Sequence, residues 1–341
     1  MTTNKQPTYV NYGAMVNTNV PFLCKGTTLD GFLVEADMDK LKALCQKVLI
    51  APAQGAVEYV PLTHYVVLAY ADVSAVSSID PPLNHVGSVN EKQVAIWVLT
   101  AAVKREAGLL VAQRIAWFVP YIIVDNPASL TGGREVYGYP KSFGWFDLQG
   151  EKIIDELKVD VFGGDFGPDK QAGRHRLLEI TAVEPNSEPQ VKNEWQSMSD
   201  AHDEIKELLW DLDEGEIIIP GFHLAEDLWQ DITKEEINQV FLKQFRSATE
   251  GSGAAFQNIN EVRSKVTRFG GASFNNKHKL TLHALDSHPI TKELGIEDQE
   301  SLLSWKVDMD FTQGISDIIW QWGEKSEPEK KGCLPLLSLF F

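Results

Sequence analysis

Residues 131–146, TGGREVYGYPKSFGWF, place a single lysine among aromatic residues, glycines and a proline. A lysine amine is nucleophilic only in its neutral form, and apolar surroundings favour that form because they penalise the ammonium. The aromatic residues near Lys141 could provide such surroundings, and Pro140 stiffens the backbone of what we expect to be a loop. These aromatic residues are Tyr137, Tyr139, Phe143, Trp145 and Phe146. The stretch therefore permits a Schiff-base lysine, although most lysines are solvated surface groups.

A longer pattern around this lysine resembles the signature of the acetoacetate decarboxylase family. Its three elements are Asp125-Asn126, Gly133-Arg134-Glu135 and Tyr139-Pro140-Lys141. The resemblance implies that Lys141 forms the Schiff base and that Arg134 and Glu135 brace the segment that carries it. It also implies substrate-binding or supporting positions for Tyr137, Tyr139 and Ser142. In acetoacetate decarboxylase the lysine is activated by desolvation or by a neighbouring cation, which is a second lysine directly after the first. Ser142 stands at that position here.

Two further positions come from the same resemblance. Glu91 precedes the apolar run 94–98, as the active-site glutamate of the family precedes a similar strand, so we assign it a catalytic role in positioning substrate or relaying protons. The substrate-carboxylate arginine of the family falls by spacing at Thr27, and Lys25 is the nearest cation. The resemblance extends from about residue 20 to residue 320, and it is strongest over 121–146.

The composition limits the class of protein. The chain has 341 residues and a formal net charge of −17, which argues against nucleic-acid and anionic-membrane partners because both need a basic face. Three widely spaced cysteines, Cys24, Cys45 and Cys333, form no disulfide framework and fit a reducing compartment. The N-terminal stretch has no apolar run, so we expect no secretory signal, and no apolar run in the sequence is long enough to span a bilayer. We therefore expect a cytoplasmic protein.

Strand patterns dominate the chain. Runs rich in β-branched and aromatic residues predict strands at 58–73, 92–103, 115–124, 152–163, 174–185, 254–269, 276–290 and 301–311. One amphipathic helix is expected after residue 37, where Asp37 is the candidate N-cap and Cys45 belongs to the apolar stripe. The fold class is mainly β (α+β), and the resemblance implies an antiparallel β-barrel with flanking helices and a homo-oligomer.

The region 190–250 differs from its surroundings and is expected to be a helical insertion within one domain spanning 1–322. Helical spacing predicts amphipathic helices at 200–212 and 233–246, with Leu208, Leu209, Val240 and Phe241 buried. The segment 323–341 forms a tail that is first charged and then apolar. A lid, an oligomer contact and decoration are all open roles for the insertion, and the tail either docks into a groove or is disordered.

Other chemistry finds little support. The chain lacks His-Glu-x-x-His, Cys-x-x-Cys, Walker and Gly-x-Ser-x-Gly motifs, and His278, His283 and His288 recur at a spacing that suits no common metal site. We expect no metal and no external cofactor.

The first hypothesis is a lyase that decarboxylates a keto acid through a Lys141 imine. Because both the second lysine and the arginine of the family are missing, we expect a bulkier substrate than acetoacetate. The second hypothesis keeps the imine but leads to aldol chemistry, dehydration or cyclisation. The third is a barrel that binds a small ligand without catalysis.

Overall fold

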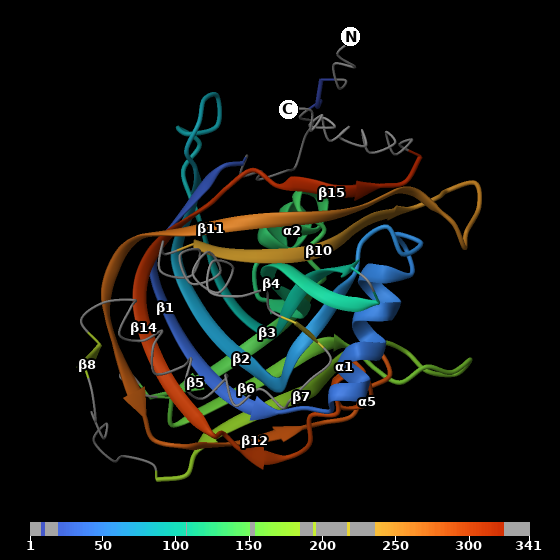
Figure 1. The fold of residues 1–341 in the computed structure, drawn as a ribbon. Helices are drawn as coiled ribbons and strands as arrows, with labels where there is room; N and C mark the ends of the chain where they lie inside the picture. Colours follow the sequence, from blue (N-terminus) through green and yellow to red (C-terminus); the bar gives the residue numbers. More distant parts are fainter. Residues whose placement is uncertain are drawn as a thin grey trace, which may run out of the picture.

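The computed structural model describes residues 8–10, 20–106, 108–150, 154–184, 194–195, 217–218 and 236–323, and most of them lie in strands. Long strands curve around a common axis, and short helices flank them (Figure 1). The principal strands are β1 (Phe22–Glu35), β2 (Tyr59–Ser78), β3 (Val89–Glu106), β4 (Leu109–Val124), β5 (Lys141–Gln149), β6 (Glu156–Gly163), β7 (Gly173–Ala182), β10 (Glu236–Arg246), β11 (Ala254–Asn275), β12 (His278–Leu282) and β14 (Leu303–Gln313). Four short strands complete the set: β8 (Glu194–Trp195), β9 (Ile217–Ile218), β13 (Gln299–Glu300) and β15 (Asp317–Gln321). The mainly β class expected from the sequence is confirmed.

Seven of the described strands close into a barrel. Their order is β10-β11-β14-β1-β2-β3-β4, and β10 returns to β4 through a short parallel pairing of Gln239 with Trp117 and of Val240 with Phe118. The neighbouring pairs within this order are antiparallel. A closed barrel has no free sheet edge, and its interior is walled by strand side chains.

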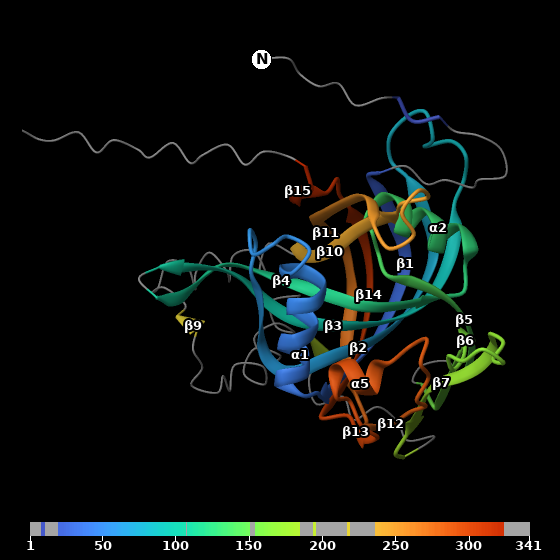
Figure 2. The same ribbon diagram turned by 90° about the vertical axis from the view of Figure 1, so that its right-hand side faces the viewer.

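A second sheet packs beside the barrel. It continues from β4 into β5, β6, β7, β12 and β13, and the β4–β5 junction is parallel, with Ile122 opposite Lys141. Figure 2 shows β5, β6 and β7 to one side of the barrel and β12 and β13 below it beside α5 (Ile290–Leu294), with α1 (Met38–Cys45) above α5. Apolar residues from the barrel strands, α1, α5 and the second sheet form the main hydrophobic cluster. This cluster fixes the second sheet, and with it Lys141, against the barrel.

Helix α1 begins as the sequence predicts. The Asp37 side chain accepts a hydrogen bond from the backbone N–H of Lys40, which satisfies one of the free donors of the first turn. Leu41, Leu44 and Cys45 are buried against the core. Burial raises the pKa of the Cys45 thiol to about 12, so Cys45 is a core residue and not a nucleophile. A π-helical turn (Gln46–Ile50) follows.

The segment before the lysine is not the loop expected from its glycines. It forms α2 (Pro127–Val136), whose N-cap Asn126 accepts hydrogen bonds from the backbone N–H groups of Ala128 and Ser129. Pro127 stands at the first helical position, where its missing N–H removes no helical hydrogen bond. The Asn-Pro pair was therefore a helix-start signal that outweighed Gly132 and Gly133.

The helix expected at 233–246 is wrong where the structure describes that segment. Residues 236–246 form strand β10, although Val240 and Phe241 are buried as predicted. A strand covered on both faces carries a continuous apolar run, here Val240-Phe241-Leu242, and such a run also fits helical spacing. The predicted helix at 200–212, with Leu208 and Leu209, and the tail after residue 323 lie outside the described residues.

Two backbone irregularities lie side by side near one end of the barrel. The pairing of β1 with β14 shifts between Cys24 and Thr27, and the pairing of β2 with β3 shifts between Val73 and Val76. Gly26 lies in the first irregularity with φ +59°, and its carbonyl accepts a hydrogen bond from the Ser74 hydroxyl of the second. A one-residue bulge reverses which residues of a strand face inward.

The far end of the barrel interior is filled by a tryptophan. Trp305 lies opposite Gly31, and a Cβ on Gly31 would lie 2.2 Å from the indole Cε2 atom. Glycine is therefore required here because the indole occupies the place of a side chain. Leu33, Val266, Val307 and Met309 complete a buried cluster with Trp305 that closes this end.

Asp30, the neighbour of Gly31, is a buried acid. It is 2 % exposed, and its Oδ1 atom has no hydrogen-bond partner. Burial raises the pKa of Asp30 to about 7, with a contribution from Asp308, while Lys306 opposes the shift. The folded protein therefore holds a proton at pH values at which the unfolded chain has lost it. Stability contributed by this proton is present below about pH 4 and is lost as the pH rises through 7.

Asp30→Asn should remove this pH dependence, because asparagine is neutral at every pH. A pKa raised from 3.8 to about 7 corresponds to a change on the order of 4 kcal/mol between pH 4 and pH 8. The variant should thus gain stability over the wild type as the pH rises, measured by urea unfolding at both pH values. Asp165→Asn, at an exposed position, serves as the control. A constant difference between wild type and Asp30→Asn would contradict the prediction.

Candidate active site

Lys141 is positioned by the turn that joins α2 to β5. Gly138 adopts φ +79°, and the backbone N–H of Tyr139 donates to the Gly133 carbonyl at 3.1 Å. The Lys141 N–H then donates to the Tyr139 carbonyl at 2.7 Å, across Pro140. The Arg134 guanidinium donates to the Lys141 carbonyl at 2.9 Å. Hydrogen bonds on both sides of the residue thus fix its backbone at the start of β5.

The Lys141 side chain meets two partners. Its Nζ atom lies 3.0 Å and 3.2 Å from the two carboxylate oxygens of Glu91, and 2.5 Å from the Ser129 hydroxyl. The Ser129 hydroxyl also contacts the Glu91 carboxylate. Lys141 is 6 % exposed and Glu91 is 5 % exposed, and together with the half-buried Ser129 they form a mutually hydrogen-bonded cluster.

One face of α2 covers this cluster. Ser129, Gly132, Gly133 and Val136 follow helical spacing and line the cavity around the amine. A Cβ on Gly133 would lie 2.9 Å from Cδ of Lys141, so the absence of a side chain there gives the lysine its path. Sequence reasoning missed Ser129. The available signal was its distance of four residues from Gly133 on a helix that begins at the Asn-Pro pair.

The cavity around the amine has a volume of about 70 Å³. Apart from Lys141, Glu91, Ser129 and two glutamines, its described walls are mostly apolar and include Phe22, Val73, Val136 and Phe311. Cys24 also lines it. Burial raises the pKa of the Cys24 thiol, the Glu91 carboxylate raises it further, and Lys141 acts in the opposite direction. Cys24 is therefore a neutral thiol and not a competing nucleophile.

The aromatic residues near Lys141 in sequence do not all surround it in space. Tyr139 lines the cavity, and its ring centroid lies 5.6 Å from the Lys141 Nζ. Tyr137 stacks behind Tyr139 at 5.0 Å and donates from its hydroxyl to the Gly314 carbonyl. Phe143 and Trp145 pack against each other, outside the walls of this cavity. The apolar environment comes mostly from distant strands and not from the local aromatic run.

Two other predicted positions lie away from the amine. Glu135 accepts a hydrogen bond from the Tyr9 hydroxyl at 2.5 Å and does not line the cavity. Ser142 points to the opposite face of β5, as alternation in a strand requires, and its hydroxyl lies 3.0 Å from His288 Nε2. Burial lowers the pKa of His288, so this partner is neutral. A cation at position 142 would lie on the other face of the strand from the Lys141 amine.

Thr27 and Lys25, the two positions considered for binding a substrate carboxylate, lie in different surroundings. Thr27 is buried and faces the barrel interior, where it lines a second cavity next to that of the lysine. Lys25 is exposed and lines neither cavity. Lys141 is therefore the one cationic side chain among the described residues that wall these two cavities.

Two further features are absent from the described residues. Across the described ranges, no group of three or more His, Cys, Asp or Glu side chains could hold a metal ion. No helix in those ranges is long and apolar enough to cross a membrane.

Solved structures resemble this chain over nearly its whole length. Acetoacetate decarboxylase from Legionella pneumophila matches with a TM-score of 0.56 at 14 % identity, covering 94 % of each chain. The chain has the acetoacetate decarboxylase-like fold. An acetoacetate decarboxylase-like enzyme from Sphingomonas wittichii matches at 0.50 with 13 % identity, covering 89 % of this chain and 94 % of its own. The enduracididine biosynthesis enzyme MppR matches at 0.50 with 12 % identity, covering 90 % of both chains. No family model and no curated protein matches the sequence.

The buried pair predicts a characteristic stability pattern. Lys141→Met leaves the Glu91 carboxylate in the cavity without its cation, and Glu91→Gln leaves the ammonium without its anion, so each should cost about 3–5 kcal/mol. The double variant removes both charges and should recover most of that loss. Urea unfolding of the four proteins at pH 7 gives the coupling energy. Additive losses in the double variant would show that the two groups do not interact.

Proposed function

We propose that the protein is a Schiff-base-forming carbon–carbon lyase that decarboxylates a keto acid, with Lys141 as its nucleophile. The observation that carries the proposal is the contact of a buried lysine amine with a buried carboxylate inside a cavity. Glu91 can accept the proton that the ammonium must lose before it attacks a carbonyl carbon. The enzymes named among the solved structures of this fold support the assignment to catalysis.

The proposed reaction begins with the attack of neutral Lys141 on the substrate ketone. The carbinolamine loses water, and Glu91 and Ser129 are placed to move the protons of this step because both contact Nζ. The protonated imine then takes up the electron pair of the breaking carbon–carbon bond as carbon dioxide leaves, which forms an enamine. Protonation of the enamine carbon and hydrolysis of the imine release the ketone and restore the lysine.

The cavity walls suit loss of a carboxylate better than its retention. Besides Lys141, no cationic side chain among the described wall residues can pair with a substrate carboxylate. An unpaired anion in such surroundings is poorly solvated, whereas carbon dioxide is neutral. The surroundings therefore favour the step that removes the charge.

A second candidate keeps the imine and changes its fate. One structure of MppR is described as a complex with the condensation product of pyruvate and imidazole 4-carboxaldehyde, at a TM-score of 0.50 and 12 % identity. The same lysine, carboxylate and hydroxyl could direct an enamine to an aldehyde instead of to a proton. The formation of carbon dioxide separates the two candidates.

Borohydride should trap a covalent adduct on Lys141 when the protein is incubated with ketones or keto acids. Intact mass and peptide mapping would locate the adduct, and carbon dioxide release from a keto acid would establish the lyase reaction. Lys141→Arg is the matched control, because arginine keeps the positive charge but forms no such imine. An adduct of equal yield in Lys141→Arg would refute the assignment.

Acetoacetate should be a poor substrate. It offers little apolar surface, and the position of the expected arginine is Thr27, which cannot form a bidentate pair with a carboxylate. A keto acid with a longer apolar chain gains binding free energy through burial, at about 0.8 kcal/mol per methylene, or roughly fourfold. The measurement is kcat/KM for a homologous series of β-keto acids. A maximum at acetoacetate would overturn this expectation.

A further inference from the structure

The cavity around Lys141 adjoins a larger one. The second cavity, which we call the inner chamber, has a volume of about 90 Å³, against about 70 Å³ around the amine. Four residues line both: Gln93, Tyr139, Phe311 and Gln313. The two spaces therefore share a wall inside the barrel.

The positions of the lining residues along the strands show in which direction the inner chamber extends from the Lys141 amine. Along β3, Glu91 lines the lysine cavity, Gln93 lines both spaces, and Ala95 and Trp97 line the chamber alone. Glu91 and Trp97 are six positions apart along β3, which corresponds to roughly 20 Å. The chamber therefore extends from the amine along the inside of the barrel. Met309 and Val266 belong both to its wall and to the cluster around Trp305, so that cluster closes its far end.

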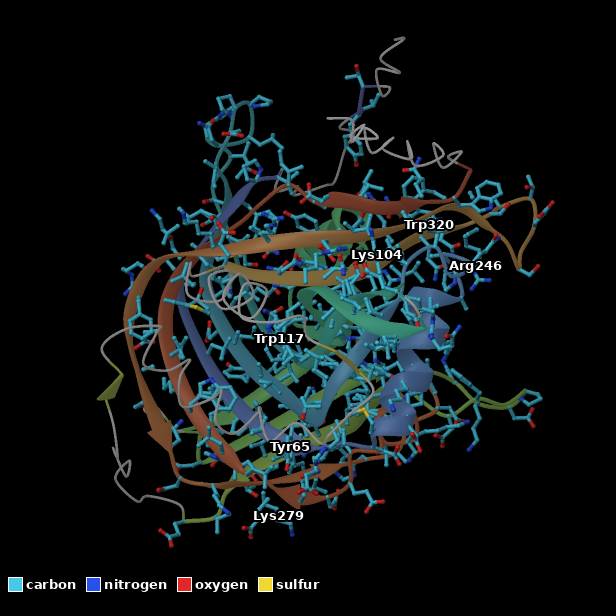
Figure 3. All side chains as sticks on the ribbon, viewed as in Figure 1. Tyr65, Lys104, Trp117, Arg246, Lys279 and Trp320 are labelled. Carbon is cyan, nitrogen blue, oxygen red and sulfur yellow. The ribbon has the colours of Figure 1, made fainter. Side chains whose placement is uncertain are left out.

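Most of the chamber wall is apolar, but four of its residues carry a buried polar atom without a hydrogen-bond partner. These atoms are Oγ1 of Thr27, Nε1 of Trp97, the hydroxyl oxygen of Tyr139 and Nε2 of Gln313. The Trp97 ring packs edge-on against Trp117, labelled in Figure 3, with 6.1 Å between the ring centroids. By contrast, the polar side chains of Gln239 and Ser264 bond to each other. Four unpaired polar atoms on residues of one cavity wall are unusual, because nearly all buried polar groups in proteins have partners.

The chemistry of these atoms defines what they can bind. The indole N–H of Trp97 and the amide N–H groups of Gln313 can only donate, and the two hydroxyls can also donate. Burial raises the pKa of Tyr139 well above its usual value, so its hydroxyl keeps the proton. The described wall of the chamber contains no charged side chain. A complementary ligand group is therefore an uncharged oxygen acceptor, because a carboxylate there would lack a countercharge.

We propose that the inner chamber binds the chain of the substrate beyond its ketone. That chain is apolar and carries an uncharged oxygen, a hydroxyl or carbonyl, that accepts a hydrogen bond from Thr27 or Trp97. This deepens the proposed function, since it rests on a ketone bound at Lys141 and specifies the rest of the molecule. A substrate as short as acetoacetate would leave these donors unpaired.

Three methyl ketones of equal chain length test the inference: 2-nonanone, its 9-hydroxy derivative, and 8-oxononanoate, which ends in a carboxylate. The half-saturating concentration for borohydride trapping on Lys141 is measured for each. The hydroxy ketone should saturate at a concentration about two- to tenfold lower than 2-nonanone, as expected for one net hydrogen bond. The carboxylate should bind more weakly than both.

Two variants locate the preference. Thr27→Val keeps the shape of the side chain and removes its hydroxyl, and Trp97→Phe removes the indole N–H. The variant that removes the donor of the bound hydroxyl should reduce the ratio between the hydroxy ketone and 2-nonanone toward one. Thr28→Val is the matched control on the opposite face of β1, where the Thr28 hydroxyl donates to Asp308, and it should keep the wild-type ratio.

Equal half-saturation for all three ketones, or tightest binding of 8-oxononanoate, would overturn the inference. So would an unchanged ratio in both chamber variants. Ligand-observed NMR titration of the same ketones, without borohydride, measures binding in the chamber independently of imine formation. It therefore distinguishes failure of the chamber proposal from failure of the Schiff-base proposal. No adduct but a preserved preference for the hydroxy ketone would refute the Schiff-base function and uphold the chamber. Adducts on Lys141 without a preference for the hydroxy ketone would support the Schiff-base function and refute the chamber proposal.

Discussion

A lysine and a glutamate held 3.0 Å apart inside a protein constrain everything built around them. Two such groups cost several kcal/mol each to remove from water, and only close pairing with further hydrogen bonds repays this. The Ser129 hydroxyl supplies the additional bond at the amine, and α2 supplies the cover. The pair is thus stable only while the helix, the turn after it and β3 keep their positions. A substrate that converts the amine to an imine therefore enters a site whose geometry is already fixed by the hydrogen bonds of the buried pair.

Closure of the barrel provides the rigidity that the pair needs, and β10 provides the closure. Its contact with β4 is short, but Glu261 of β11 joins the surrounding strands. The buried Glu261 carboxylate accepts hydrogen bonds from Tyr59 of β2, Arg114 of β4 and Asn238 of β10. Phe241 of β10 packs on Tyr139 with ring centroids 4.4 Å apart, and the backbone of Lys243 lies against Gly138. The strand that completes the barrel therefore also supports the turn that carries the lysine.

The sequence allowed good prediction where chemistry is local. The Asp37 cap and the alternating strands could be read from neighbouring residues, and the predicted fold class is confirmed. The catalytic role of Lys141 came from the resemblance of the Tyr139-Pro140-Lys141 pattern and stays a prediction. Glu91 was assigned only through resemblance, because no local sequence pattern predicts its contact with a lysine fifty positions later. The strand β10 was misread because burial on both faces erases the alternation that identifies a strand. The inner chamber escaped prediction altogether, since its wall is assembled from strands scattered along the chain and depends on their bulges.

The bulge at Gly26 links the character of the barrel interior to the length of the chain. Before the bulge Phe22 and Cys24 face inward, and after it Thr27 and Leu29 do, while Gly31 makes room for Trp305. Straightening this bulge in a chain of unchanged length would turn the outer set of β1 inward, bringing Asp30 and Phe32 into the interior in place of Leu29 and Gly31. Deleting the extra residue together with the bulge would instead restore a regular strand with the same residues facing inward. In a lineage of such barrels, a single-codon insertion or deletion at this point is therefore absorbed by gaining or losing the bulge, while the binding surface that β1 presents is kept.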